Sequence, residues 1–208
     1  MGTPPEDRKV PLFVTDNLLR RVVSDPKKTA SRYVSPSNTV ADLGCGTGYF
    51  TIPMAELAGR EGKVYAVDFD EKAVERVAAK AEERGLGGVV EARASSAADV
   101  GFVPDHSVDF VFAHGLLCCM KDHSGALREM RRILKRDGRM YLSVTKFGRK
   151  KDPRAVGADE WRKVLDGFHV LSSGDGVLTR WALVSVPDEP REEDAGEAAG
   201  AETGPGCC

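Results

Sequence analysis

The sequence predicts an α/β fold, a Rossmann-like doubly wound sheet that is mostly parallel and ends in a C-terminal antiparallel hairpin strand. Three observations predict it. An apolar run from Thr39 leads into a glycine-rich turn over 44–48. Further strand-like runs follow, most of them separated by stretches of helical periodicity, in what we interpret as five alternations. The run 108–112 is almost wholly apolar, as in a parallel strand that is covered on both faces.

The expected elements can be placed along the chain from periodicity and from breakers such as Asp25-Pro26. The first predicted strand starts at Thr39 and leads into the glycine turn. The other predicted strands cover 62–70, 89–93, 108–112, 139–144, 169–172 and 178–186, and we expect the last two to form an antiparallel pair. The predicted helices cover 16–24, 27–34, 50–58, 71–84, 124–134 and 159–166. We expect Asp70 to cap the start of helix 71–84, Gly59 and Gly85 to end helices, Asp137-Gly138 to form a turn and 146–158 to form a loop.

Composition limits the class of protein. The 208 residues suit one domain, and a hydrophobic share of 41% with 30% charged residues is ordinary for a globular chain. The net charge of −2 gives no global preference for nucleic acid. No apolar run approaches the roughly 18 residues needed for a membrane span, and no hydrophobic N-terminal segment indicates a signal peptide. The five cysteines are odd in number and include two adjacent pairs, which does not fit a disulfide framework, so we expect a cytoplasmic location.

The last 22 residues differ in composition from the rest. After residue 186 the chain has seven acidic residues and one basic residue, Arg191, and no large apolar residue follows Val186. Such a segment cannot offset its ordering entropy by burial. We therefore predict three regions: an N-terminal helical extension over 1–37, a domain over 38–186 and a disordered acidic tail over 187–208. The terminal Cys207-Cys208 pair is not a C-a-a-X prenylation signal and receives no role.

The glycine turn indicates a nucleoside site. Glycine tolerates the positive φ of a sharp strand-to-helix turn and lets a ligand approach the backbone closely. Asp68 ends the second strand, 22 residues after Gly46, about the spacing at which an acid reaches a bound ribose. Glycines at 44, 46 and 48 followed by Tyr49 do not fit the G-x-G-x-x-G dinucleotide pattern, which argues against an NAD-dependent oxidoreductase.

A G-x-G-x-G turn preceded by Asp42 resembles that of class I S-adenosylmethionine (SAM)-dependent methyltransferases, of the small-molecule, quinone-biosynthesis-like type. The resemblance spans roughly 38–186, and it implies that the N-terminal extension covers the cofactor cleft. It implies SAM as cofactor, with the backbone of Gly44, Cys45, Gly46 and Gly48 beside its methionine and ribose parts. Asp68 then accepts hydrogen bonds from both ribose hydroxyls and Phe69 packs on the adenine. Asp42 orients the turn or reaches the ligand's amino group through water; capping the turn is the alternative.

The third-strand region departs from the family pattern. Many relatives carry an acid that binds the adenine amino group, and Ser96 aligns with that position. A serine hydroxyl can accept one hydrogen bond but brings no charge. The Ala97 N–H could still serve an adenine ring nitrogen. We expect weaker SAM affinity or a bridging water here.

The segment Ala113-His114-Gly115-Leu116-Leu117 after the fourth strand should lie at the ligand crevice beyond the carboxyl ends of the strands. It lacks the Asn/Asp-Pro-Pro-Tyr/Phe motif of amino-group methyltransferases and the Pro-Cys of cytosine C5 enzymes. It resembles the group that methylates small molecules. His114 either lines the cofactor site or deprotonates an acceptor, so no catalytic residue is assigned.

Cys118 and Cys119 invite a metal or arsenic interpretation. Adjacent cysteines are expected to point in different directions, and no C-x₂-C pair completes a site. We therefore expect no metal site and interpret the pair as small buried hydrophobes.

These features predict an enzyme, a SAM-dependent methyltransferase that acts by SN2 displacement on an O, N, S or C nucleophile of an unidentified small molecule. Two alternatives stay open. A clustered basic face formed by the residues of 128–136 and 146–151 would favour an RNA or protein acceptor, although nucleic acid is not the expected partner. Ser96 and the lack of an assigned base would favour a module that binds SAM without catalysis. Oligomeric state is not indicated.

Overall fold

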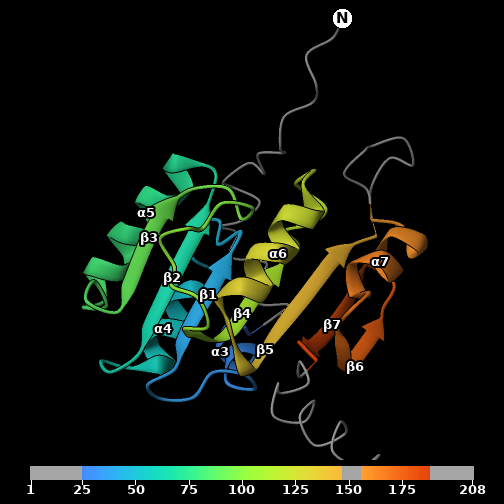
Figure 1. Ribbon diagram of the computed structural model, residues 1–208. Helices are drawn as coiled ribbons and strands as arrows, with labels where there is room; N and C mark the ends of the chain where they lie inside the picture. The colour runs from blue at the N-terminus through green and yellow to red at the C-terminus, as the bar shows by residue number, and fades with distance from the viewer. Residues whose placement is uncertain (1–24, 147–155, 188–208) are drawn as a thin grey trace, which may run out of the picture.

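The computed structural model describes residues 25–146 and 156–187. Within them, seven strands form one sheet in the order β3-β2-β1-β4-β5-β7-β6 (Figure 1). The strands are β1 (Thr39–Leu43), β2 (Lys63–Asp68), β3 (Val90–Ala94), β4 (Val108–His114), β5 (Leu134–Thr145), β6 (His169–Asp175) and β7 (Thr179–Ser185). The first five strands are parallel, whereas β7 is antiparallel to both β5 and β6. The predicted doubly wound sheet with an antiparallel C-terminal hairpin is confirmed.

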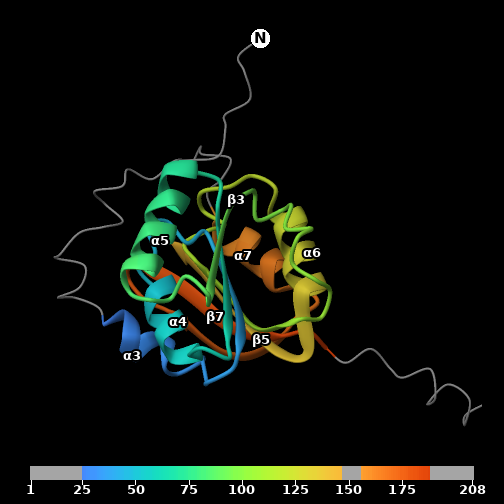
Figure 2. The same ribbon diagram turned by 90° about the vertical axis from the view of Figure 1, so that its left-hand side faces the viewer.

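Helices cover both faces of the sheet (Figure 2). On one face lie α3 (Pro26–Ala30), α4 (Thr51–Ala58) and α5 (Glu71–Glu83), and on the other lie α6 (His123–Ile133) and α7 (Ala158–Leu165). Alternation along the buried strand β4 explains the two layers. Phe110 and Phe112 share a buried cluster with α4, while Val111 and Ala113 share one with α6 and α7. No described helix has both the length and the apolar character that crossing a membrane requires.

Local signals place the helix ends. The Asp70 side chain accepts a hydrogen bond from the Lys72 N–H at the start of α5, as predicted. Gly59 ends α4 with φ +71°, and Gly85 follows α5 with φ +68°. Both have a positive φ, which glycine adopts without a steric cost.

Three predicted boundaries differ from the structure by at least three residues. The helix expected over 27–34 ends at Ala30 and continues as turns. Asp137-Gly138 lies inside β5, which starts at Leu134, because a register irregularity absorbs the expected turn. The strand expected over 169–172 runs on to Asp175, because it keeps pairing with β7.

The expected alternation of strands and helices fails at one connection. The chain between β3 and β4 runs through turns and contains no helix. Local side-chain bonds compete with helix formation there: Ser96 Oγ accepts from the Ala98 N–H and Ser95 Oγ donates to the Asp99 carbonyl. The predicted helix 16–24, the acidic tail from 188 and most of the predicted loop 146–158 lie outside the described residues.

Candidate functional site

The carboxyl ends of β1, β2 and β4 meet at one edge of the sheet, where the strand order reverses around β1. Open α/β sheets bind their ligands at this point. The glycine turn follows β1, Asp68 ends β2 and His114 ends β4. The topology therefore places residues that the sequence singled out at the same edge.

The glycine turn has the backbone that its sequence predicts. Gly44, Gly46 and Gly48 have φ values of +79°, +53° and +83°. The N–H groups of Gly44 and Cys45 both donate to the Val67 carbonyl, at 2.8 and 3.0 Å, so the turn is anchored to β2. The packing is tight, since a Cβ on Gly44 would lie 3.1 Å from Leu116 Cδ1.

Asp68 closes the turn from the neighbouring strand. Its Oδ2 accepts from the Gly46 N–H at 2.9 Å, and its Oδ1 accepts from the Asp70 N–H at 3.0 Å. Burial raises the pKa of Asp68, and the hydrogen bonds from Asp70 and Gly46 partly oppose that rise. A carboxylate offers about four acceptor positions. Backbone N–H groups of Gly46, Asp70 and Phe69 fill part of these positions, and the rest can accept from ligand donors such as the hydroxyls of a ribose.

The Asp42 side chain forms a buried hydrogen bond within the protein. Its side chain is buried, and its Oδ2 accepts a hydrogen bond of 2.5 Å from the Thr51 hydroxyl. The bond joins the end of β1 to the first turn of α4 and thereby fixes the helix behind the glycine turn. This geometry matches the turn-orienting role among the alternatives for Asp42. Nothing in the sequence pattern marked Thr51.

Thr47 supplies a polar group that the sequence analysis did not single out. Its side chain is 1% exposed, and its hydroxyl has no hydrogen-bond partner among the described residues. Its carbonyl accepts from Lys80 Nζ at 2.9 Å. A buried hydroxyl without a partner carries a free-energy cost that a bound polar ligand can relieve. In the sequence, the position of this threonine between two turn glycines is the one feature that could have marked it as a candidate ligand-binding residue.

Cys45 faces away from the edge. It is buried in a cluster with Ala66 and Val77. Burial raises the pKa of the Cys45 thiol, and the nearby Asp42 and Asp68 carboxylates raise it further. Cys45 can therefore offer a ligand its backbone rather than a reactive sulfur.

The segment after β3 is tied to β2 at its start. The Ser95 N–H donates to the Asp68 carbonyl at 3.0 Å. The Ser96 hydroxyl accepts from the Ala98 N–H at 3.2 Å, and Ala97 is buried in the main core cluster. Ser96 thus helps to shape this turn, while its hydroxyl proton can still be donated to a ligand.

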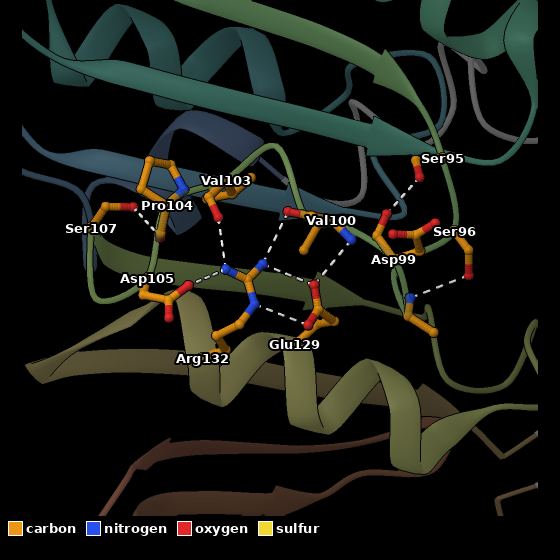
Figure 3. Close-up of polar contacts among 11 residues, drawn as sticks. Ser95, Ser96, Asp99, Val100, Val103, Pro104, Asp105, Ser107, Glu129 and Arg132 are labelled. Carbon is orange, nitrogen blue, oxygen red and sulfur yellow. Dashed lines mark hydrogen bonds and ion pairs between the residues drawn. The ribbon is translucent and has the colours of Figure 1, made fainter.

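The rest of the β3–β4 connection is held by α6 (Figure 3). Arg132 donates to both carboxylate oxygens of Glu129, at 3.0 and 2.9 Å. The same guanidinium donates to the carbonyls of Val103 and Val100, at 2.9 and 3.1 Å, and to Asp105. Glu129 in turn accepts from the Val100 N–H at 3.1 Å. A side-chain network between distant segments therefore replaces the missing crossover helix.

His114 lies among aromatic rings at the end of β4. Its ring centroid is 5.0 Å from that of Phe50, 5.9 Å from that of Phe112 and 6.3 Å from that of Tyr141. The Phe112 and Tyr141 rings are nearly parallel to the imidazole. Burial raises the pKa of Tyr141 to about 12, so its phenol stays neutral. Phe50 and Phe112 of this stack carry no polar side-chain atom, so His114 and Tyr141 supply its polar groups.

Cys118 and Cys119 differ from their expected state. Both thiols are free and only partly buried, and they interact with each other. The contact between the two thiols contradicts the expectation that they point apart. The pair is also less buried than expected, although Cys118 still packs against the main core cluster. A hydrogen bond from the Cys119 side chain, followed by one from Thr145, lowers the pKa of Cys118 to about 5. No group of three or more metal-ligating side chains occurs in the part of the chain that the structure describes.

Comparisons with known proteins agree with this geometry. Residues 41–142 match a family model described as a methyltransferase domain. Over 108 residues, or 52% of this chain, the sequence is 37% identical to nocamycin O-methyltransferase of Saccharothrix syringae. Over 105 residues, or 50%, it is 36% identical to demethylmenaquinone methyltransferase of Geobacillus stearothermophilus. The aligned regions cover 38% and 44% of those relatives, so the chain spans less than half of either.

A solved structure extends the likeness of the fold. A SAM-dependent methyltransferase from Aquifex aeolicus superposes with a TM-score of 0.73 at 24% identity. The superposition covers 85% of this chain and 97% of that protein. At this identity the comparison supports the fold and not the activity.

Proposed function

We propose that this chain, whose residues 41–142 belong to the class I SAM-dependent methyltransferase family, binds SAM and transfers its methyl group to a small molecule. The observation that carries the proposal is the Asp68 carboxylate. It fixes the Gly46 N–H at 2.9 Å and keeps acceptor positions for a ribose diol at the reversal point of the sheet.

The described residues suit SAM in chemistry as well as position. The Gly44–Gly48 backbone gives a ligand close access, and the buried Thr47 hydroxyl lacks a partner within the described chain. We assign Asp68 to the ribose and Phe69 to the adenine face. Ser96 and Ala97 flank the adenine end, and Ser96 lacks the charge of an acid there. This difference predicts moderate rather than tight SAM binding.

When bound, SAM supplies an electrophilic methyl group on a sulfonium whose leaving group is neutral. The protein then has to hold the acceptor atom in line with the methyl carbon, and such positioning can supply much of the rate. His114 lies at the end of β4, on the side that we assign to the acceptor. Its imidazole can accept the proton that a hydroxyl, thiol or amine loses on methylation.

The contacts of two basic residues on α6, Arg131 and Arg132, favour a small-molecule acceptor. Arg131 stacks on Phe168 at 3.9 Å and donates to the Asp166 carbonyl. Arg132 donates to protein partners from all three guanidinium nitrogens. Cations that are engaged inside the fold are poorly placed to neutralise phosphates. The names of the two relatives point to small molecules as well, and we further propose a cytoplasmic location.

Calorimetric titration with SAM, S-adenosylhomocysteine and NAD tests the proposal. We expect SAM and S-adenosylhomocysteine to bind and NAD not to bind. Incubation with methyl-labelled SAM and a panel of phenols, quinols, thiols and amines should then transfer label to one acceptor class. Binding of NAD alone would overturn the cofactor assignment. Binding of SAM with no transfer to any acceptor would favour the non-catalytic module, for which Ser96 is the motivating residue.

A further inference from the structure

The turn between β4 and α6 presents two adjacent thiols. Cys118 and Cys119 follow Leu117, and the Cys119 N–H donates to the Leu116 carbonyl at 2.8 Å, which closes a tight turn. Both cysteines are partly exposed, whereas Leu117 and Met120 on either side are buried. The neighbours thus anchor the turn in the core, while the two cysteines between them are only partly buried.

One buried imidazole fixes the backbone on both sides of the pair. His123 Nε2 lies 2.7 Å from the Leu117 carbonyl oxygen and 3.1 Å from that of Met120. His123 Nδ1 lies 3.3 Å from Glu160 Oε1 on α7. The turn therefore cannot reshape without breaking these contacts. A fixed backbone reduces the entropy that two thiols lose when both bind one ligand.

The side chains around Cys118 favour its thiolate. The Cys119 side chain is hydrogen-bonded to Cys118, and Thr145 Oγ1 donates to Cys118 Sγ at 3.5 Å. Cys118 can donate to the Gly115 carbonyl at 3.2 Å only while it is protonated. The donors lower the pKa of Cys118 to about 5, whereas free cysteine titrates near ~8.5. The thiolate is the form that attacks electrophiles and binds soft elements.

The number of sulfur atoms selects the kind of ligand. Structural zinc sites almost always use four protein ligands, and the described residues hold no cluster of even three candidate ligands. A trivalent arsenic atom that carries one organic group needs two sulfur bonds to complete its valence. Two adjacent thiols in contact supply that number.

We propose that Cys118 and Cys119 form a dithiol site that binds trivalent arsenicals. In the binding reaction, an arsine oxide R–As=O and the two thiols give a cyclic R–As(S–Cys)₂ and one water. Two As–S bonds form, the oxygen leaves with both thiol protons, and arsenic stays trivalent. The site lies close to His114 in sequence, but its formation requires neither SAM nor methyl transfer.

Phenylarsine oxide is the probe for this site. The full chain should carry Cys207→Ser and Cys208→Ser in every sample, because the terminal cysteines are a second adjacent pair. Intact-mass measurement should show the mass of the chain plus one phenylarsine oxide, less one water. The adduct should survive excess glutathione and be removed by dithiothreitol, because only a dithiol competes with a two-sulfur chelate.

Single variants test whether both sulfur atoms take part. Cys118→Ser and Cys119→Ser should each abolish the glutathione-resistant adduct, although Cys45 is retained in both. Peptide mapping of the protein with Cys118 and Cys119 unchanged should place one arsenic on the peptide that contains both. Because this sample carries no substitution at the site, misfolding of a variant cannot explain the result. Absence of an adduct on the unsubstituted pair, its location elsewhere, or its persistence in either single variant would overturn the proposal.

The outcome can be separated from that of the proposed function. An Asp68→Ala variant should lose SAM binding and still form the adduct. If the unsubstituted pair binds no arsenical while SAM binds normally, only the dithiol site is refuted. If the adduct forms but SAM does not bind, the cofactor assignment fails and the dithiol site stands.

Discussion

Asp68 and Gly46, 22 residues apart in the chain, are joined by a hydrogen bond of 2.9 Å between the carboxylate and the turn amide. The contact makes the end of β2 part of the glycine turn. It also leaves the carboxylate with acceptor positions that the protein does not fill. The same side chain can therefore shape the turn and bind the ligand.

Replacing Asp68 with Ala should remove both functions. Two hydrogen bonds from ribose hydroxyls to a charged acceptor contribute roughly 1.5–3 kcal/mol each, so SAM affinity should fall by about 100-fold or more. Calorimetry measures the change. Asp70→Asn is the matched control, because asparagine caps a helix as well as aspartate does and the Asp70 N–H is kept. Equal affinity in Asp68→Ala and the unsubstituted protein would contradict the assignment.

Gly48→Ala should destabilise the turn. Gly48 has φ +83°, where an L-residue costs about 1–2 kcal/mol, and its added Cβ would lie 3.3 Å from Val77 Cγ2. Urea unfolding should show that loss together with weaker SAM binding. Gly101→Ala is the control, since a Cβ there meets no atom within 4 Å and its φ is outside the left-handed region. A loss of equal size in both variants would show that turn geometry is not the cause.

Arg132→Ala should release the β3–β4 connection from α6. The Arg132 side chain is only 26% exposed, and its guanidinium binds Glu129 and two carbonyls, so we expect a loss of about 2 kcal/mol in the free energy of unfolding. SAM affinity should also fall, because Ser96 and Ala97 lie on the released connection. Arg162→Ala is the control, because its ion pair with Asp159 is largely exposed. A loss of stability in Arg132→Ala without a change in SAM affinity would mean that the network does not position the site.

The alkylation rate of Cys118 by iodoacetamide should hardly depend on pH between about 6 and 8, because a thiol with a pKa of about 5 is already ionised there. Below pH 5 the thiolate is protonated and the rate should fall. An ordinary cysteine would instead gain roughly tenfold in rate per pH unit up to ~8.5. Mass-spectrometric mapping separates Cys118 from the other thiols.

Thr145→Val is the matched variant for this measurement. It removes the hydroxyl that donates to Cys118 Sγ and keeps the shape of the side chain. The pKa should rise, so the alkylation rate should now increase across the pH range in which the unsubstituted protein shows a plateau. A plateau unchanged by Thr145→Val would mean that Thr145 does not stabilise the thiolate.

The sheet and its glycine turn could be predicted because their causes are local. Apolar runs, glycines at fixed spacing and a terminal acid each act within a few residues. The positive φ of Gly44, Gly46 and Gly48 follows from the turn itself. The position of Asp68 beside Gly46 follows once two parallel strands are neighbours.

Contacts between distant side chains could not be predicted in this way. The Asp42–Thr51 bond depends on how α4 packs behind β1, and no local pattern marks it. The Arg132 network depends on a connection about 30 residues earlier that forms no helix. The orientation of Cys118 and Cys119 depends on the turn that His123 holds from outside the pair.

The use of Arg132 in place of a crossover helix has a consequence for the order of assembly. A helix between β3 and β4 would make its backbone hydrogen bonds among its own residues. Here Val100 and Val103 receive their partner only after Arg132 has been added, 32 and 29 residues later. On a growing chain this network can therefore hold the β3–β4 connection only after α6 has been synthesised. A nascent chain that stops before α6 would lack the side chain that ties Val100 and Val103 in place.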